Sequence, residues 1–322
     1  MDGNYSICLG TAGWGMWHSS DAGESWTRHR RPFPLNSRIQ ALVAHPTQPK
    51  TLFAGGDTGF FVSHDSGATW ERVGTQGDLP TIWSLAIDPS NPDTLFAGTR
   101  PAGVYRTRDG GQHWERLSVD IAAECAIGTP FVTALAVDPD DSNVVWAGVE
   151  IDGIYRSTDG GDTWAAVRTG MHDLDIHDMT VAATRPKRLY VSTASAMFVS
   201  DNLGDSWQSM GIEDKWPLPY ARGLAVKPDD PRVLYAGCGQ TTTGEAGHVL
   251  RTTDYGQRWE TLPFPTPANA TLWGMSTHPA DPNRIVAFTL FGEVYVSDDA
   301  GTAWRKIGRD FGEIRSAAWV PN

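Results

Sequence analysis

The sequence is poor in cysteine and has no long apolar run. Its 322 residues include only three cysteines, Cys8, Cys125 and Cys238. Because the set is odd and sparse, we expect buried thiols rather than a disulfide framework, a redox site or a metal site. No segment approaches the roughly 18 apolar residues of a membrane span, and the N-terminus lacks the basic and apolar regions of a signal peptide. We therefore expect a cytoplasmic protein that does not associate with membranes.

Basic charge is also scarce. The chain has 26 Lys and Arg against 38 Asp and Glu, which gives a formal net charge of −12. A non-specific nucleic-acid binder needs a basic surface to displace counterions, and anionic membranes attract basic segments. The composition therefore predicts neither of these partners. It leaves small-molecule ligands open, because the field of a local site can oppose the net charge.

Several motifs of enzyme chemistry are missing. The sequence has no Gly-rich phosphate loop between a strand and a helix, no nucleophile elbow and no HExxH motif. We predict no nucleotide or other cofactor. A divalent metal held by His172, Asp175 and His177 is a minority alternative, since imidazole and carboxylate groups are metal ligands.

The sequence does contain many glycines and tryptophans and a strong internal repeat. An eight-residue pattern close to S/T-x-D-x-G-x-S/T-W occurs seven times, and its Trp residues are 43 to 52 positions apart. This spacing fits four short strands per repeat, which is typical of a propeller blade. The repeats end at Trp26, Trp70, Trp114, Trp164, Trp207, Trp259 and Trp304.

Each residue type of the pattern suits a tight hairpin turn. The Asp carboxylate can accept hydrogen bonds from backbone N–H groups, with help from the Ser or Thr hydroxyl. The Gly allows a positive φ, and the Trp fills the space against neighbouring strands. We therefore place the pattern between the third and fourth strands of each blade and give its carboxylates a structural role.

Two further repeated segments complete the blades. Sequences such as LFAGGDTG predict a second strand with its loop, and sequences such as IQALVAHP predict an inner strand. Residues 6–26 lack an inner strand, whereas residues 314–322 form an inner strand with no blade after it. We predict an all-β, seven-bladed β-propeller of four-stranded antiparallel blades that spans 1–322 as one domain. Pairing of 314–322 with 6–26 would close the ring, leave no open edge and make the chain complete.

The seven motifs resemble the Asp-box, or BNR, repeats of sialidases, xyloglucan-active glycosidases, sortilin-type receptors and photosystem II assembly factors. The resemblance covers nearly the whole chain and implies a propeller whose boxes lie away from the active face. Sialidases have six blades and an arginine triad, and xyloglucan-active enzymes place a carboxylate pair between two propellers. This chain shows neither pattern, so the resemblance implies a fold but no single activity.

Candidate site residues are those that the repeat does not explain. The second position of the inner strands is large and different in every blade, which suits an asymmetric ligand at the mouth of the channel. Around the ring it reads Gln40, Trp83, Thr133, His177, Arg222, Trp273 and Arg315. The next position is small in most blades but is Asp178 in one of them. We predict His177, Asp178, Glu150 and Tyr220 as catalytic groups.

A second set is predicted to bind the substrate. Tryptophans outside the repeat pattern can stack on a ring, and arginines from different blades can bind a carboxylate or phosphate. The set comprises Trp14, Trp83, Trp216, Trp273, Arg100, Arg222, Arg315 and Asp175. The alternative is that the tryptophans merely fill the top of the channel and that the polar loop at 172–179 is only solvated.

Three functions remain open from the sequence. The first is an intracellular enzyme of hydrolase or lyase type that acts on a small polar or ring-containing molecule at the channel mouth. The second is a non-catalytic propeller that binds a protein partner or assists assembly, and the third is a carbohydrate-binding module. A small-molecule ligand is favoured over a protein partner.

Overall fold

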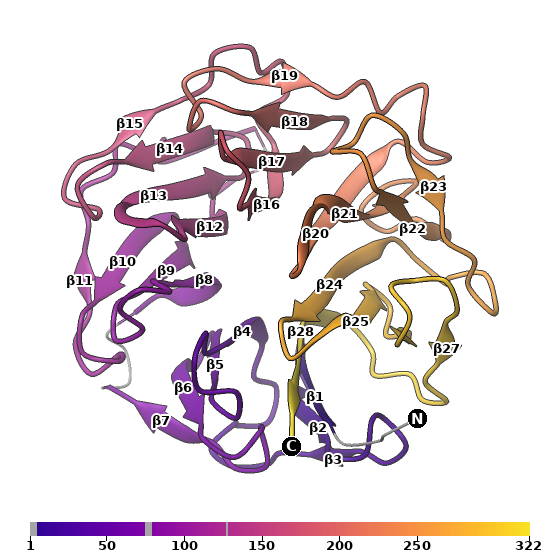
Figure 1. The fold of residues 1–322 in the computed structure, drawn as a ribbon. Coiled ribbons are helices and arrows are strands. Elements are labelled where there is room, and N and C mark those ends of the chain that lie inside the picture. The colour runs from indigo at the N-terminus through magenta and orange to yellow at the C-terminus, as the bar shows by residue number, and fades with distance from the viewer. Residues whose placement is uncertain (1–4, 75–78, 127) are drawn as a thin grey trace.

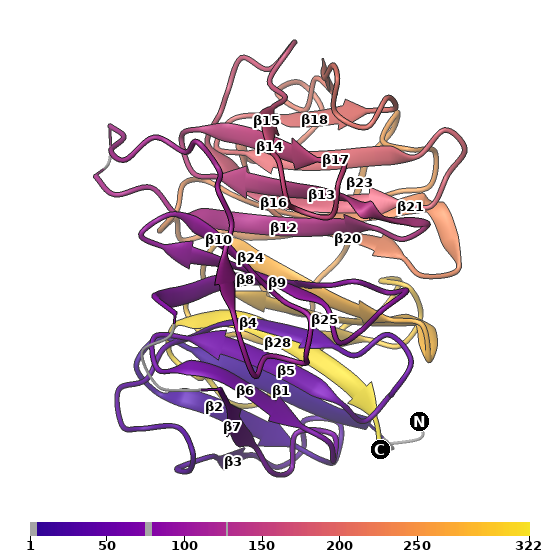
Figure 2. The same ribbon diagram turned by 90° about the vertical axis from the view of Figure 1, so that its left-hand side faces the viewer.

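The chain forms a ring of seven antiparallel sheets (Figure 1). The computed structural model describes residues 5–74, 79–126 and 128–322, and this part of the chain contains strands, turns and loops but no helix. Each sheet has four strands, so the sheets are the blades of a seven-bladed β-propeller. Seen from the side, the inner strands run along the ring axis (Figure 2).

The two strands nearest the axis are the longest in each blade. The inner strands are β4 (Ile39–Ala44), β8 (Thr81–Ile87), β12 (Val132–Asp138), β16 (Ile176–Ala182), β20 (Tyr220–Lys227), β24 (Leu272–His278) and β28 (Ile314–Pro321). The second strands are β5 (Leu52–Gly56), β9 (Leu95–Arg100), β13 (Asp141–Val149), β17 (Arg188–Thr193), β21 (Asp230–Gly239), β25 (Asp281–Thr289) and β1 (Tyr5–Thr11).

The two outer strands are shorter and flank the repeated turns. The third strands are β6 (Gly59–Ser63), β10 (Gly103–Thr107), β14 (Gly153–Ser157), β18 (Met197–Ser200), β22 (Gly247–Thr252), β26 (Val294–Ser297) and β2 (Gly15–Ser19). The fourth strands are β7 (Glu71–Val73), β11 (Glu115–Arg116), β15 (Ala165–Ala166), β19 (Gln208–Ser209), β23 (Glu260–Thr261), β27 (Arg305–Lys306) and β3 (Thr27–Arg28). The predicted strand order is confirmed.

The ring closes as the sequence predicted. The last strand, β28, pairs antiparallel with the first, β1, in a sheet of order β28-β1-β2-β3. The yellow and indigo strands lie side by side in Figure 1. Tyr5 faces Pro321 at one end of this pairing and Thr11 faces Ile314 at the other. Closure leaves every inner strand flanked by blades on both sides, which removes two sheet edges.

Apolar side chains between successive blades form the core. Trp146, Trp319 and Tyr190 are among the largest fully buried side chains, and Trp17 is also buried. Trp17, Trp146 and Trp319 therefore belong to the core. Each cluster joins residues of two neighbouring blades, so the blades are stabilised chiefly by contact with one another.

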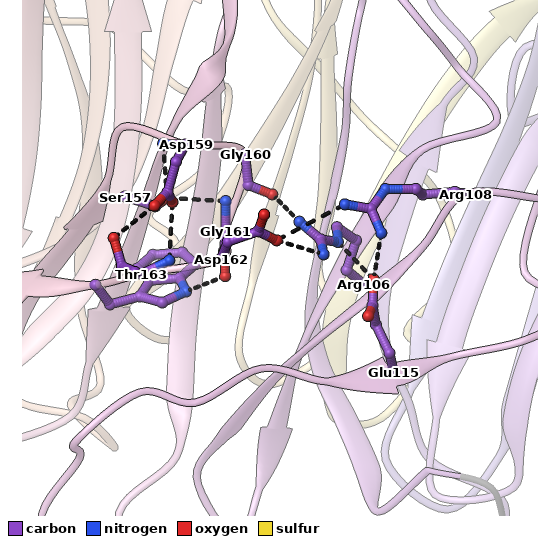
Figure 3. Close-up of polar contacts among 10 residues, drawn as sticks. Arg106, Arg108, Glu115, Ser157, Asp159, Gly160, Gly161, Asp162 and Thr163 are labelled. Atoms are coloured by element: carbon purple, nitrogen blue, oxygen red, sulfur yellow. Dashed lines mark hydrogen bonds and ion pairs between the residues drawn. The ribbon is translucent and has the colours of Figure 1, made fainter.

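The repeated turns have the hydrogen bonds that their residue types predict. In the turn at 157–164, Asp159 accepts bonds from the Ser157 hydroxyl at 2.7 Å and from the Thr163 N–H at 2.8 Å (Figure 3). The Gly161 N–H donates to the Ser157 hydroxyl at 2.8 Å. Asn202 replaces the Asp in another blade and accepts the equivalent bonds from Ser200 and Ser206.

The turns also show a feature that the sequence pattern did not reveal. The residue before the repeated Gly of each turn has a positive φ as well, for example Ala22 at 59° and Tyr255 at 62°. Two left-handed residues in succession turn the chain sharply, and a non-glycine residue in this region is strained. The hydrogen bonds of the Asp and the packing of the Trp hold this conformation.

Buried arginines connect each of several blades to the repeated turn of the next blade. Arg106 on β10 bonds the Gly160 carbonyl and the Asp162 carboxylate, the latter at 2.7 Å (Figure 3). Arg156 reaches Leu203 at 2.9 Å in the same way. Such bonds satisfy turn carbonyls that face the neighbouring blade, and they fix the angle between blades. The sequence analysis did not anticipate these arginines.

A substitution in one turn tests its structural role. Asp65 accepts bonds from Ser63, from the Thr69 N–H at 2.8 Å and from the Thr69 hydroxyl at 2.6 Å. Asp65→Ala should lower the free energy of unfolding by about 1–3 kcal/mol, because turn donors lose their acceptor. Asp65→Asn should cost clearly less, as Asn202 fills the same place in another blade. Denaturant titration measures both, and equal losses would contradict this account.

Candidate functional site

A cavity of about 230 Å³ lies at the end of the channel where the inner strands begin. Its lining includes the second or third residue of each inner strand: Gln40, Trp83, Thr133, His177, Arg222, Trp273 and Arg315. The expected ring of side chains is therefore present. Leu42, Val43, Met275 and Ala317 line both this cavity and a second one at the other end of the channel, so they lie between the two.

A β-bulge presents each of these seven residues to the channel. In the first complete blade, Ile39 pairs with Gly56 and Ala41 with Gly55, so Gln40 has no partner on β5. The register shifts in the same way at the channel residue of each of the other six blades. A bulge places two residues opposite one and changes the direction of a side chain. The sequence analysis found the positions but not the bulges that orient them.

Two arginines and a tryptophan form the most charged side of the cavity. The guanidinium of Arg222 lies 3.8 Å from the ring centre of Trp273, and that of Arg315 lies 5.0 Å from it. Arg222 is buried, with 8% of its surface exposed. Each cation is held over the face of the aromatic ring, where the negative quadrupole attracts it.

An aromatic pair forms another side of the cavity. Trp83 contacts Phe131, with ring centres 4.1 Å apart. Arg100, at the end of β9, lies 5.0 Å from Phe131 and 5.8 Å from Trp83. Arg100 does not line the cavity itself, so it belongs to the rim. Phe131 was not among the predicted residues, although it directly precedes an inner strand and is apolar.

His177 lines the cavity in a neutral form. Its Nδ1 donates to the Ala221 carbonyl at 2.7 Å, while its Nε2 lies 3.4 Å from the Tyr220 hydroxyl and from the Asp175 carboxylate. Burial, followed by the charge of Arg222, lowers the pKa of His177. The Tyr220 hydroxyl therefore donates to the unprotonated Nε2 and itself accepts a bond from Thr242 at 3.0 Å. Thr242 comes from the long loop after β21 and was missed.

Asp178 has a structural role that differs from the predicted catalytic one. One carboxylate oxygen accepts a bond from the Met179 N–H and the other from the Leu224 N–H, each at 2.8 Å. Leu224 follows the bulge of the neighbouring inner strand, where the N–H groups lack their usual partners. Asp178 thus joins β16 to β20. Burial raises its pKa to about 6, and the two backbone bonds oppose this shift.

Glu150 carries the most unusual carboxyl group of the site. It follows β13 on the mouth side, beside the cavity rather than in its lining. Its Oε2 is buried and has no hydrogen-bond partner among the described residues. Burial, and then the charge of Asp175, raise the pKa of Glu150 to about 7, against the opposing charges of Arg222 and Arg100. About half of these carboxyl groups are therefore protonated at neutral pH.

Two predicted ligand-binding tryptophans lie elsewhere. Trp216 is buried between blades, edge-on to Trp259 with ring centres 5.2 Å apart, so it packs the core and does not reach the channel. Trp14 is 54% exposed and stacks under Arg28 on the β1–β2 turn, outside the cavity lining. The structure places neither side chain in the cavity, because Trp216 lies in the core between blades and Trp14 on an exposed loop of the mouth side.

The minority metal alternative finds no support in the geometry. The ring of His172 packs edge-on against Phe198 at 5.0 Å, away from the pair formed by Asp175 and His177. Across the described ranges, no three His, Cys, Asp or Glu side chains gather as a set of metal ligands.

The same part of the chain contains no helix long and apolar enough to span a membrane.

Comparisons with known proteins identify the fold and some distant relatives. The family model of Sortilin-Vps10 (sortilin, neurotensin receptor 3) matches residues 58–150. A probable oligoxyloglucan-reducing end-specific xyloglucanase of Neosartorya fischeri is 32% identical over 111 residues, 31% of this chain and 14% of the enzyme. The Hypocrea jecorina xyloglucanase is 32% identical over 114 residues, which are 34% of this chain and 13% of that enzyme. The chain thus aligns with only a small part of these relatives.

Solved structures match most of the chain. A GH74 enzyme of Niastella koreensis superposes with a TM-score of 0.67 at 19% identity, covering 95% of this chain and 47% of the enzyme. YCF48 bound to a peptide superposes with a TM-score of 0.62 at 16% identity, covering 93% and 87%. The shared feature is the seven-bladed propeller. It occurs here in an enzyme and in a peptide-binding protein, so the fold does not choose between the two.

The structural role of Asp178 gives a second prediction. Asp178→Ala should lower the free energy of unfolding by roughly 2–5 kcal/mol, because two backbone N–H groups lose charge-assisted bonds. Asp178→Asn should lose part of this stability, because the amide offers one accepting oxygen instead of two. Denaturant titration at pH 7.5 compares both variants with Asp140→Ala, which removes an exposed carboxylate at the opposite end of the channel. An unchanged stability for Asp178→Ala would contradict the role.

Proposed function

We propose that this propeller is an enzyme of hydrolase or lyase type that acts on a small polar or ring-containing molecule at the mouth of the central channel. The observation that carries the proposal is the half-buried carboxyl of Glu150, whose Oε2 is buried without a partner among the described residues and whose pKa is about 7, beside a cavity lined by His177. Acid–base catalysts are tuned to this range. The cytoplasmic location stays a prediction.

The two titratable groups have complementary forms at neutral pH. Glu150 retains a proton that it can donate to a leaving group. His177 is neutral, and its Nε2 can accept the proton of the Tyr220 hydroxyl as that hydroxyl takes one from water or from a substrate carbon. Tyr220 orients this nitrogen through its hydroxyl. A donor and an acceptor on neighbouring blades are the minimum that hydrolysis or elimination requires.

The relatives support the hydrolase class but do not identify the substrate of this chain. Two of them are xyloglucanases, and the structural neighbours include a GH74 enzyme. This chain spans about half of that neighbour and aligns with less than a sixth of the curated enzymes. A sugar ring therefore remains a proposal for this chain, and the tryptophans of the cavity are suited to stack on one.

Removal of the Glu150 proton tests the proposal. Hydrolysis of 4-nitrophenyl glycosides, glycosiduronates and xyloglucan oligosaccharides should occur in the native protein. Its kcat/KM should fall about tenfold per pH unit above pH 7, as the general acid loses its proton. Glu150→Gln should lose roughly 100-fold or more in rate while its Tm is maintained, because the amide is isosteric and cannot donate an acidic proton.

A matched control makes the result specific. Glu24→Gln changes an exposed carboxylate on a repeated turn and should leave the rate unaltered. Full activity of Glu150→Gln would show that another group donates the proton. Failure of the native protein to turn over any compound in the panel would favour the second candidate function.

The second candidate is a non-catalytic propeller that binds a protein segment. The large hydrophobic side chains that are exposed in the described residues are Trp14, Leu35 and Phe291. They lie on loops of the mouth side that are joined by hydrogen bonds, from Gly13 to Ser37 at 3.1 Å and from Phe311 to Gly292 at 3.2 Å. We call these loops, residues 12–15, 28–38, 290–293 and 309–313, the apolar rim.

The charge of the apolar rim indicates the chemistry of a partner. The segment 28–38 contains four arginines and no carboxylate, in a protein whose net charge is −12. Arg30, Arg31 and Arg38 are exposed, and no ion pair joins any of the four to a described residue. An acidic segment with bulky apolar residues is complementary to this surface.

A peptide pair tests the second candidate. A fluorescent peptide of Glu and Leu should bind with an affinity that falls as salt rises, whereas a Lys and Leu peptide of equal apolarity should not bind. Leu35→Ser combined with Arg31→Glu should reduce the anisotropy change at least tenfold. Equal binding of both peptides, or an unaffected variant, would exclude the apolar rim as the docking surface.

A further inference from the structure

The cavity at the channel mouth has the size of one substituted ring. Its volume is about 230 Å³. An apolar cavity of about 150 Å³ accommodates benzene, and one water occupies about 30 Å³ of liquid. A six-membered ring with a few polar substituents therefore fits. Trp83 and Trp273 both line the cavity, so aromatic side chains border the space that a ring would occupy.

Arg222 is a buried cation without a counter-ion among the described residues. Arg222 exposes only 8% of its surface, and its guanidinium lies over the ring of Trp273. No carboxylate in the described ranges forms an ion pair with the Arg222 guanidinium, and the guanidinium donates no hydrogen bond to these residues. Burial of a charge is costly unless it is paired. This arrangement is therefore typical of a site that awaits a charged ligand.

None of the described acidic groups around Arg222 forms an ion pair with its guanidinium. Both oxygens of Asp178 accept backbone N–H bonds at 2.8 Å. Glu150 is partly protonated, since burial raises its pKa to about 7. Asp175 lies 3.4 Å from the Nε2 of His177. Each of these groups acts on Arg222 only through space, so none fills the hydrogen-bonding directions of its guanidinium.

A second guanidinium reaches the same cavity. Arg315 lies 5.0 Å from Trp273 and 6.0 Å from Trp83, and its Nη2 pairs with Glu313. Its Nε is buried and has no partner among the described residues. Burial, and then repulsion by Arg222, lower the pKa of Arg315 to about 10. Two cations that repel each other within one cavity are stabilised together when an anion binds between them.

From these contacts we propose that the channel cavity binds a small ring-bearing molecule through an oxyanion group, a carboxylate or phosphate, held by Arg222 and Arg315. The ring stacks on Trp273 or Trp83, and the guanidinium groups donate to the oxygens. This inference rests on the proposed use of the channel mouth as a small-molecule site, and it names the chemical class of that molecule. It requires binding only, so it is measured separately from turnover.

A thermal-shift titration of the whole chain tests the inference at low ionic strength. The probes are glucuronate, benzoate, glucose 6-phosphate, inorganic phosphate and neutral glucose, each up to about 10 mM, ten times a Kd of about 1 mM. The anionic ring compounds should raise the Tm in a saturable way, and glucose should not. Glucuronate and glucose 6-phosphate distinguish a carboxylate from a phosphate as the preferred group.

Arg222→Met separates ligand binding from a packing role. The Met keeps much of the apolar stem but removes the buried charge, so the Tm of the unliganded variant should rise by roughly 2 °C or more. Its ligand-induced shift should disappear. Arg116→Gln, an exposed arginine on the outer strand β11, should keep both the native Tm and the native ligand response.

Several outcomes would overturn the inference. The anion requirement is wrong if glucose raises the Tm as much as glucuronate. The site is wrong if no anion, phosphate included, shifts the Tm, or if Arg222→Met lowers the Tm and still responds to the probes. Glu150→Gln should retain the anion response even when it loses turnover. Binding without turnover in the native protein would therefore refute the enzyme proposal and leave this inference standing.

Discussion

The site depends on one backbone feature, the β-bulge that interrupts every inner strand near its start, at the second or third residue. In a regular strand, alternate side chains point to the two faces of the sheet, and both faces of a propeller blade are covered by neighbouring blades. The extra residue at each bulge has no partner on the second strand, so its side chain turns toward the axis. Seven bulges in register therefore give seven channel side chains. Because these side chains face the channel, each can differ in size and charge.

Contacts elsewhere in the scaffold stabilise the ring, so the channel side chains can vary. Ring closure pairs β28 with β1 and gives every blade a neighbour on both sides, and buried arginines such as Arg106 bind the turns of the next blade. The bulges do leave backbone N–H groups without partners, and one of them is satisfied by Asp178. This explains why a carboxylate stands where most blades have a small residue. The most anomalous residue of the sequence thus stabilises the bulge, although it also lines the cavity.

Burial at the channel mouth leaves some titratable groups neutral and one of them charged. It favours the neutral forms of Glu150 and His177, which leaves one group able to donate a proton and one able to accept it. Arg222 stays charged, because its intrinsic pKa is far above neutrality, and it therefore keeps an unmet demand for an anion. A ligand that carries both an anionic group and a ring would satisfy this demand and exclude water from Glu150. The same burial thus links recognition to acid–base chemistry.

The sequence alone determined the fold, because seven Asp and Gly turns with a following Trp specify blade number and strand order through local hydrogen bonds and spacing. It also found the channel ring, since those positions break the repeat. It could not show that Trp216 packs between blades, because its burial depends on residues of the neighbouring blade such as Trp259. Only the tertiary structure decided that Asp178 binds backbone N–H groups, that Glu150 lacks a partner and that Arg222 lacks a counter-ion. Burial and pairing are properties of residues from different blades, so no local pattern encodes them.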